Sequence, residues 1–105
     1  MEVPFRPLGK VMEIASSTGL EITYAFDDLV FSEHSVFVIR FDKEKEDKLN
    51  LYFNQQCEKK TANAIKQKLF EAAAQQKVQL LEIGKFNLKP IEGKEEIEIE
   101  FFENN

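Results

Sequence analysis

The chain has 105 residues, a length that suits one domain with a hydrophobic core and is too short for two independent cores. Its composition, 43% hydrophobic and 31% charged with four Gly and three Pro, excludes a linker or a disordered tail. The net charge of −5 repels phosphate backbones, and no stripe of Lys or Arg offsets it, so we expect no nucleic-acid partner.

The single cysteine, Cys57, excludes an internal disulfide framework. The start of the chain lacks the pattern of a signal peptide. Together these two features predict a cytoplasmic protein. No apolar run approaches the roughly 20 residues that a membrane helix needs, so we expect a soluble protein without a membrane partner.

The chain begins with a pattern that predicts a short helix from Pro7 to about Thr18. Its apolar stripe consists of Leu8, Val11, Met12 and Ala15. Gly19 can adopt the left-handed conformation that closes a helix.

From Leu20 the apolar period changes to two, which predicts strands over residues 20–26 and 29–31 with a turn or bulge at Asp27–Asp28. Residues 32–35 form a polar turn. Residues 36–41 are apolar on both faces except at Arg40, as expected of an interior strand. Residues 42–48 are all charged and predict a hairpin loop, after which residues 49–54 form the partner strand.

The second half of the chain predicts a long helix followed by two strands. The helix spans about Glu58 to Gln76 and should lie across the sheet. The next strand, residues 78–88, shifts its apolar phase twice, which predicts bulges near Leu80–Leu81 and at Gly84. The last strand turns Ile97, Ile99 and Phe101 inward and glutamates outward.

These segments predict a single α+β domain over residues 1–105, with a curved antiparallel sheet of about five or six strands and two helices in the order α-β-β-β-β-α-β-β. In element order this is similar to the small α+β fold of type III secretion chaperones, although their final helix is missing. Those chaperones are acidic cytoplasmic dimers that hold an extended segment of a partner, so the resemblance implies a protein-binding role.

No catalytic residues, metal site or cofactor are expected. The segments that hold His34 and Cys57 are separate, a hairpin tip and the start of the long helix, which favours a structural cysteine over a Cys-His nucleophile. Asp27 and Asp28, with Glu33, offer carboxylates for Mg²⁺ or Ca²⁺, but aspartates at this position are more typical of a turn. The four glycines are widely spaced and match no phosphate-binding motif.

Three functions from different classes remain. The first is a non-enzymatic, chaperone-like protein-interaction domain that forms a homodimer and uses apolar surface in acidic surroundings, with the ten Phe residues supplying either core or patch. The second is a small-ligand-binding protein or modest enzyme with a pocket between the sheet and the long helix, for which we expect the polar residues Tyr24, Arg40 and Tyr52. The third is an acidic inhibitor or immunity-type protein that masks a basic active site with Glu96, Glu98 and Glu100.

Overall fold

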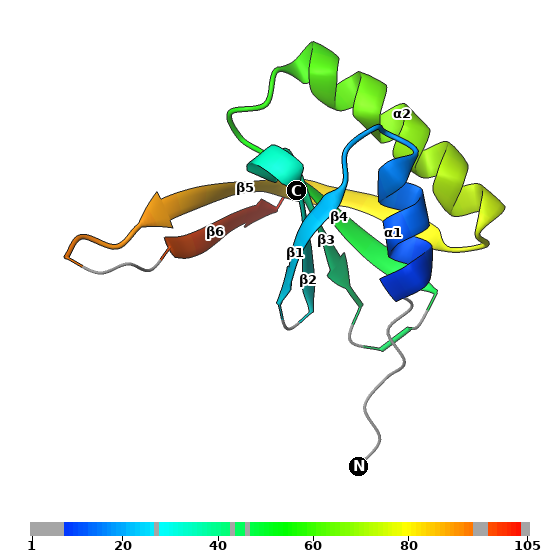
Figure 1. Ribbon diagram of the computed structural model, residues 1–105, viewed down its shortest axis with the longest axis horizontal. Helices are drawn as coiled ribbons and strands as arrows, with labels where there is room; N and C mark the ends of the chain where they lie inside the picture. The colour runs from blue at the N-terminus through cyan, green and yellow to red at the C-terminus, as the bar shows by residue number, and fades with distance from the viewer. Residues whose placement is uncertain (1–7, 27, 43, 46, 94–96, 104–105) are drawn as a thin grey trace.

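Helices and strands follow one another along the chain in the predicted order (Figure 1). The computed structural model describes residues 8–26, 28–42, 44–45, 47–93 and 97–103. Within these residues the elements are α1 (Leu8–Ser16), β1 (Ile22–Phe26), β2 (Leu29–Ser32), the 3₁₀ turn η1 (Glu33–Ser35), β3 (Phe37–Phe41), β4 (Lys48–Asn54), α2 (Lys59–Gln75), β5 (Gln79–Pro90) and β6 (Ile97–Glu103). The predicted α+β class and its order of helices and strands are confirmed.

The strands form one sheet with the spatial order β1-β2-β3-β4-β5-β6. Every neighbouring pair runs antiparallel except β4 and β5, which are parallel. The sheet is therefore mixed, and the prediction of an antiparallel sheet is wrong at this one pair. The 17 residues of α2 span about 25 Å at 1.5 Å per residue, about the length of β4. The helix therefore returns the chain to the starting end of β4, where β5 begins in the same direction.

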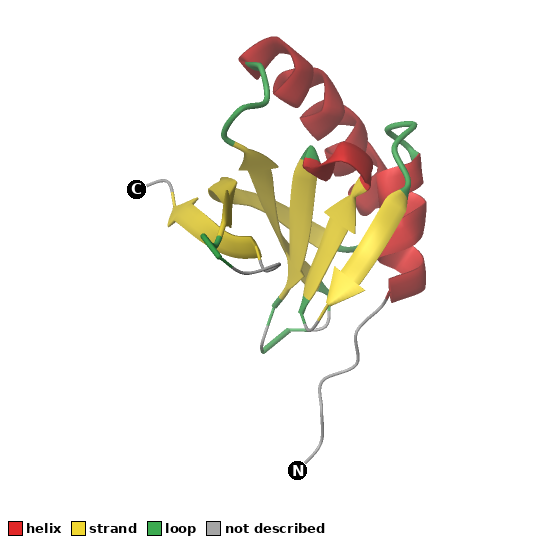
Figure 2. Ribbon diagram, turned by 60° about the vertical axis from the view of Figure 1, so that its left-hand side comes forward, coloured by secondary structure: helices red, strands yellow, loops and turns green. Residues whose placement is uncertain are grey.

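Both helices pack on one face of the sheet (Figure 2). In α1 the residues facing the sheet are Val11, Ile14 and Ala15, and in α2 they are Leu69 and Ala73. They contact the buried side chains of Phe37, Ile39, Phe41, Leu49, Leu51 and Phe53. The prediction that the long helix lies across the sheet is confirmed. Gly19, with φ of 84°, follows the end of α1 as predicted.

The opposite face of the sheet buries a second apolar cluster. Phe31, Val38, Tyr52 and Phe86 form its centre, and Leu88, Ile99 and Phe101 pack against it. Contacts between β6 and β3, which are three strands apart in the sheet, require the sheet to curve, because adjacent strands lie about 4.8 Å apart. The face that carries no helix is thus partly covered by the β5–β6 hairpin.

One of the two predicted bulges is present. Leu51 pairs with Glu82 and Tyr52 with Gly84, so Ile83 is an extra residue in β5, next to the expected position. The prediction of a bulge near Leu80–Leu81 is wrong, because consecutive residues of β4 and β5 pair there without a register shift. The apolar pattern breaks at this point for another reason: Leu80 is buried in the helix-side core, and Leu81 is half-buried on the other face.

Phenylalanine serves mainly as core in the described part of the chain. Phe31, Phe37, Phe41, Phe53 and Phe86 are buried, whereas Phe70 and Phe102 are exposed. No helix among the described residues is both long enough and apolar enough to cross a membrane.

Candidate functional site

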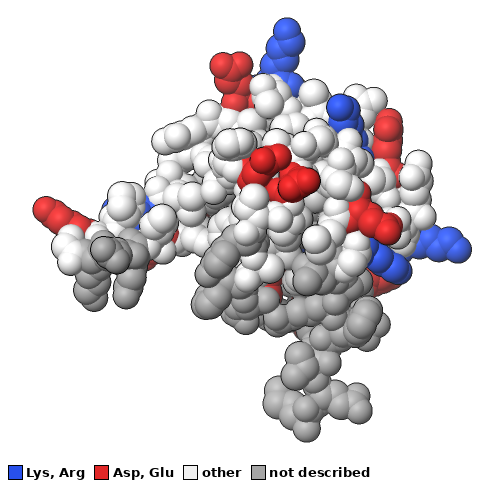
Figure 3. All heavy atoms as spheres, in the orientation of Figure 1, with Lys and Arg blue, Asp and Glu red and all other residues white. Residues whose placement is uncertain are grey.

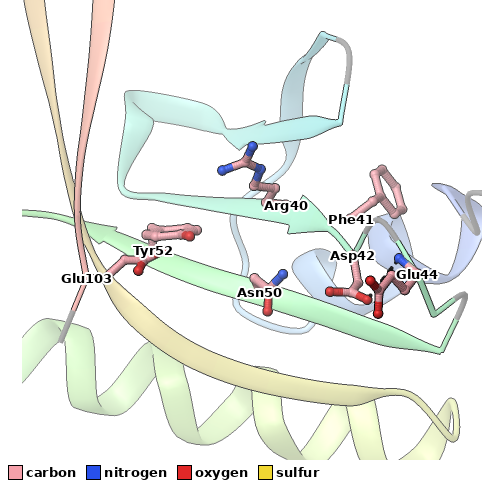
Figure 4. A pocket seen from close by; sticks show the side chains of 7 residues that line it. All are labelled: Arg40, Phe41, Asp42, Glu44, Asn50, Tyr52 and Glu103. Carbon is pink, nitrogen blue, oxygen red and sulfur yellow. Dashed lines mark hydrogen bonds between the residues drawn. The ribbon is translucent and has the colours of Figure 1, made fainter. Parts of the chain in front are cut away.

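Arg40 and Tyr52, two of the residues predicted to line a pocket, lie together on the face of the sheet that carries no helix. Strands β3 and β4 pair Arg40 with Asn50 and Val38 with Tyr52, which places these side chains on one face. Figure 4 shows Arg40 and Tyr52 projecting away from the helix beneath the strands. They line a hollow of about 330 Å³ together with Phe41, Asp42, Glu44, Asn50 and Glu103. The backbone of Tyr24 lies in β1, but its side chain is outside the described part.

The guanidinium group of Arg40 is held by two contacts. Its Nε donates a hydrogen bond of 2.9 Å to Oδ2 of Asp28, and its Cζ lies 5.6 Å from the ring centroid of Phe101. The hydrogen bond with Asp28 raises the pKa of Arg40 further above its ordinary value. Asp28, which the sequence offered as a turn residue or metal ligand, is therefore the anionic partner of Arg40. Asp27 lies outside the described residues.

Tyr52 is buried against the same hairpin. Its ring centroid lies 4.6 Å from that of Phe101, with the ring planes tilted by 56°. Burial raises the pKa of Tyr52, so its hydroxyl stays protonated at neutral pH.

The mouth of this hollow is acidic. Oδ2 of Asp42 accepts hydrogen bonds from the backbone N–H groups of Glu44 and Lys45 at 3.1 and 3.0 Å, which lowers the pKa of Asp42. Asp42 thus caps the charged loop. Among the described residues no group of three or more His, Cys, Asp or Glu side chains is arranged to hold a metal ion. The hollow therefore combines one cation, Arg40 paired with Asp28, with the carboxylates of Asp42, Glu44 and Glu103.

His34 and Cys57 were expected to be separate, but they line one hollow of about 290 Å³. Asn54 joins the two segments, because its Nδ2 donates a hydrogen bond of 3.0 Å to the backbone oxygen of Ser35. Burial, followed by the charge of Glu58, raises the pKa of Cys57, which keeps the thiol protonated. The side chain of His34 is 81% exposed. This pair lacks the lowered thiol pKa that a nucleophile needs.

A third hollow, also about 290 Å³, lies between the first half of α2 and the sheet, where the sequence predicted a pocket. Neither Arg40 nor Tyr52 lines it. Its charged residues are Lys59, Lys66, Glu82 and Lys85. Nζ of Lys66 lies 3.4 Å from Oε1 of Glu82. The sequence did not predict this lysine group, because Lys59 and Lys66 come from α2 and Lys85 from β5. Along each element alone, these lysines resemble an ordinary solvent-exposed face.

The predicted acidic face lies on the edge strand β6. Glu98 is exposed and Glu100 is half-buried, while Glu96 lies outside the described residues. The same strand exposes two large apolar side chains, Ile97 at 63% and Phe102 at 46%. On the face seen in Figure 3, acidic and basic side chains are interspersed, with no gathered basic patch among the described residues.

No protein-family model, no curated protein and no solved structure matches this chain.

Proposed function

We propose that this chain is a non-enzymatic protein-interaction domain of the cytoplasm, which forms a homodimer and holds a protein or peptide in a chaperone-like manner. The observation that carries the proposal is the edge strand β6, where Ile97 and Phe102 are 63% and 46% exposed. Large apolar side chains that stay exposed along an unpaired edge strand, here one near each end and on opposite faces, are typical of surfaces that another chain covers.

The chemistry of the hollows supports binding over catalysis. Arg40 is paired with Asp28, and the raised pKa values of Tyr52 and Cys57 keep both groups neutral at physiological pH. An enzyme of this size needs a base, nucleophile or electrophile whose pKa suits its task. Neither Tyr52 nor Cys57 is therefore activated as a base or nucleophile.

Affinity capture from a lysate of the source cells tests the proposal, with the tagged wild-type domain compared with an Ile97→Ser/Phe102→Ser variant. We expect the wild type to retain a protein partner at stoichiometric amounts and the variant to lose it. Both positions are exposed, so the variant should keep its fold, which circular dichroism checks. Capture of the same partner by both proteins, or of none by the wild type, would contradict the proposal.

A small-ligand function is the second candidate, and the hollow between α2 and the sheet favours it. Three lysines and one glutamate line this hollow in a chain with a net charge of −5, so an anionic ligand suits it best. Thermal unfolding with inorganic phosphate or citrate would test this candidate, because a ligand bound only to the native state raises the unfolding temperature.

The acidic inhibitor or immunity-type function is a special case of the first proposal. It applies if the captured partner is a basic enzyme.

A further inference from the structure

We propose that the free edge of β6 binds an extended partner segment in which basic residues alternate with apolar ones. The segment would add a further strand to the sheet. This inference rests on the proposed function and names the chemistry of the partner.

The backbone of β6 is available for such pairing. Its residues Ile97 to Glu103 pair with Pro90 to Gly84 of β5 on one side, and no strand in the described part of the chain pairs with its other side. An edge strand presents a row of N–H and C=O groups that a peptide can continue. These seven residues are long enough to fix the register of an added strand.

The side chains of β6 define what the added strand should carry. Glu98 and Glu100 lie on one face, opposite Lys89 and Asn87 of β5, and no salt bridge joins either glutamate to another residue in the described ranges. Ile97 and Ile99 lie on the other face, where Ile97 is 63% exposed. Residues directly opposite each other on paired strands share a face and interact. Lys or Arg at alternate positions would meet the two carboxylates, and apolar residues between them would meet the two isoleucines.

A second copy of β6 is a poor occupant of this edge. Antiparallel pairing centred on Ile99 places Glu98 opposite Glu100 of the other copy, and pairing centred on Glu100 places two Glu100 carboxylates together. Like charges directly opposite each other destabilise a strand pair. The acidic residues therefore select against self-pairing and in favour of a basic strand.

Titration calorimetry with a synthetic peptide of alternating Lys and Val tests the inference on the full chain. The control peptide has the same composition with its lysines in one block, so it cannot place charge at every second position. We expect the alternating peptide to bind about tenfold more tightly than the block peptide. Affinity should fall as salt is added, because exposed ion pairs are screened.

Two charge variants locate the binding. Glu98→Lys/Glu100→Lys should weaken binding of the alternating peptide by about tenfold. Glu21→Lys/Glu71→Lys changes the net charge equally at exposed positions away from β6, and it should leave affinity within about twofold of wild type. A peptide of alternating Glu and Val should prefer the Glu98→Lys/Glu100→Lys variant to the wild type.

N-methylation of the peptide tests strand addition itself. One peptide is methylated on its Lys nitrogens and another on its Val nitrogens, which blocks opposite edges of the extended chain. We expect one of the two peptides to bind and the other to fail. Once the strand direction is set and the lysines lie on the face of Glu98 and Glu100, only one edge of the peptide can face β6. Equal binding by both, equal binding of the alternating and block peptides, or no effect of Glu98→Lys/Glu100→Lys would overturn the inference.

The two proposals fail in different ways. Capture of a cellular partner by wild type and the Glu98→Lys/Glu100→Lys variant alike, with no preference among peptides, would overturn the inference and leave the interaction function standing. Peptide binding as expected, with no cellular protein retained, would support the edge chemistry and count against the proposed function.

Discussion

Gly84 lies in β5 opposite Glu103 of β6, where backbone already fills the space for a side chain. A Cβ at this position would overlap the carbonyl oxygen of Phe102 and lie 2.8 Å from Cα of Glu103. We expect Gly84→Ala to lower the free energy of unfolding by about 2–3 kcal/mol, measured by urea denaturation, because an extra carbon must displace β6.

Gly9 provides the matched control for this substitution. It lies in α1, and no atom of the described residues outside its own stretch of helix lies within 4 Å of an added Cβ, so Gly9→Ala should stabilise the protein by about 0.5 kcal/mol. A Gly84→Ala protein as stable as the wild type would show that the close approach of β6 is not required.

Cys57 is a free, partly buried cysteine that lines the same hollow as His34. Burial raises its pKa, so the reactive thiolate forms only at higher pH than in an ordinary cysteine. We expect slow alkylation by iodoacetamide at neutral pH and a rate that rises through a midpoint above roughly 8.5, the value of a free cysteine. The urea-unfolded chain serves as the control. A midpoint below that of the unfolded chain would revive a catalytic role for the hollow shared with His34.

Strands β5 and β6 each carry an aromatic residue near their pairing, and the two residues lie in opposite environments. Phe86 is fully buried in the second core, whereas Phe102 is 46% exposed. Phe86→Ala should lower the free energy of unfolding by about 3–5 kcal/mol, and Phe102→Ala by about 0.5 kcal/mol. Denaturant titrations of both variants measure the difference. Similar losses would mean that Phe102 packs against the rest of the fold.

For the whole molecule, the proposed homodimer needs an interface, and β1 is the better candidate of the two sheet edges. Its residues, Ile22–Phe26, include no charged side chain, so this edge lacks the protection that glutamates give β6. Sedimentation equilibrium should show a dimer of the wild type and a monomer of a Thr23→Lys/Ala25→Lys variant. Both positions are exposed, so the variant should keep its circular dichroism spectrum.

Glu98→Lys/Glu100→Lys is the control for this experiment and should remain dimeric, because it alters the opposite edge. A monomeric wild type at all concentrations would contradict the homodimer, and a dimeric β1 variant would place its interface elsewhere.

Local patterns in the sequence determined which segments become helices and strands and in what order. The apolar stripe of the long helix, the period-two pattern of β1, β4 and β6, and the two-sided apolar character of β3 each depend on residues close together in the chain. Arg40 stood out as the polar exception in an apolar strand, and the structure places it in a hollow with Tyr52.

Only the tertiary structure decided how these elements pair and which side chains meet. The docking of α2 made β4 and β5 parallel, and the curvature of the sheet carried Phe101 of β6 to Arg40 of β3. The same packing brought His34 and Cys57 to one hollow. Periodicity reports burial along one segment, whereas strand direction and side-chain convergence depend on free energies summed over contacts between distant segments.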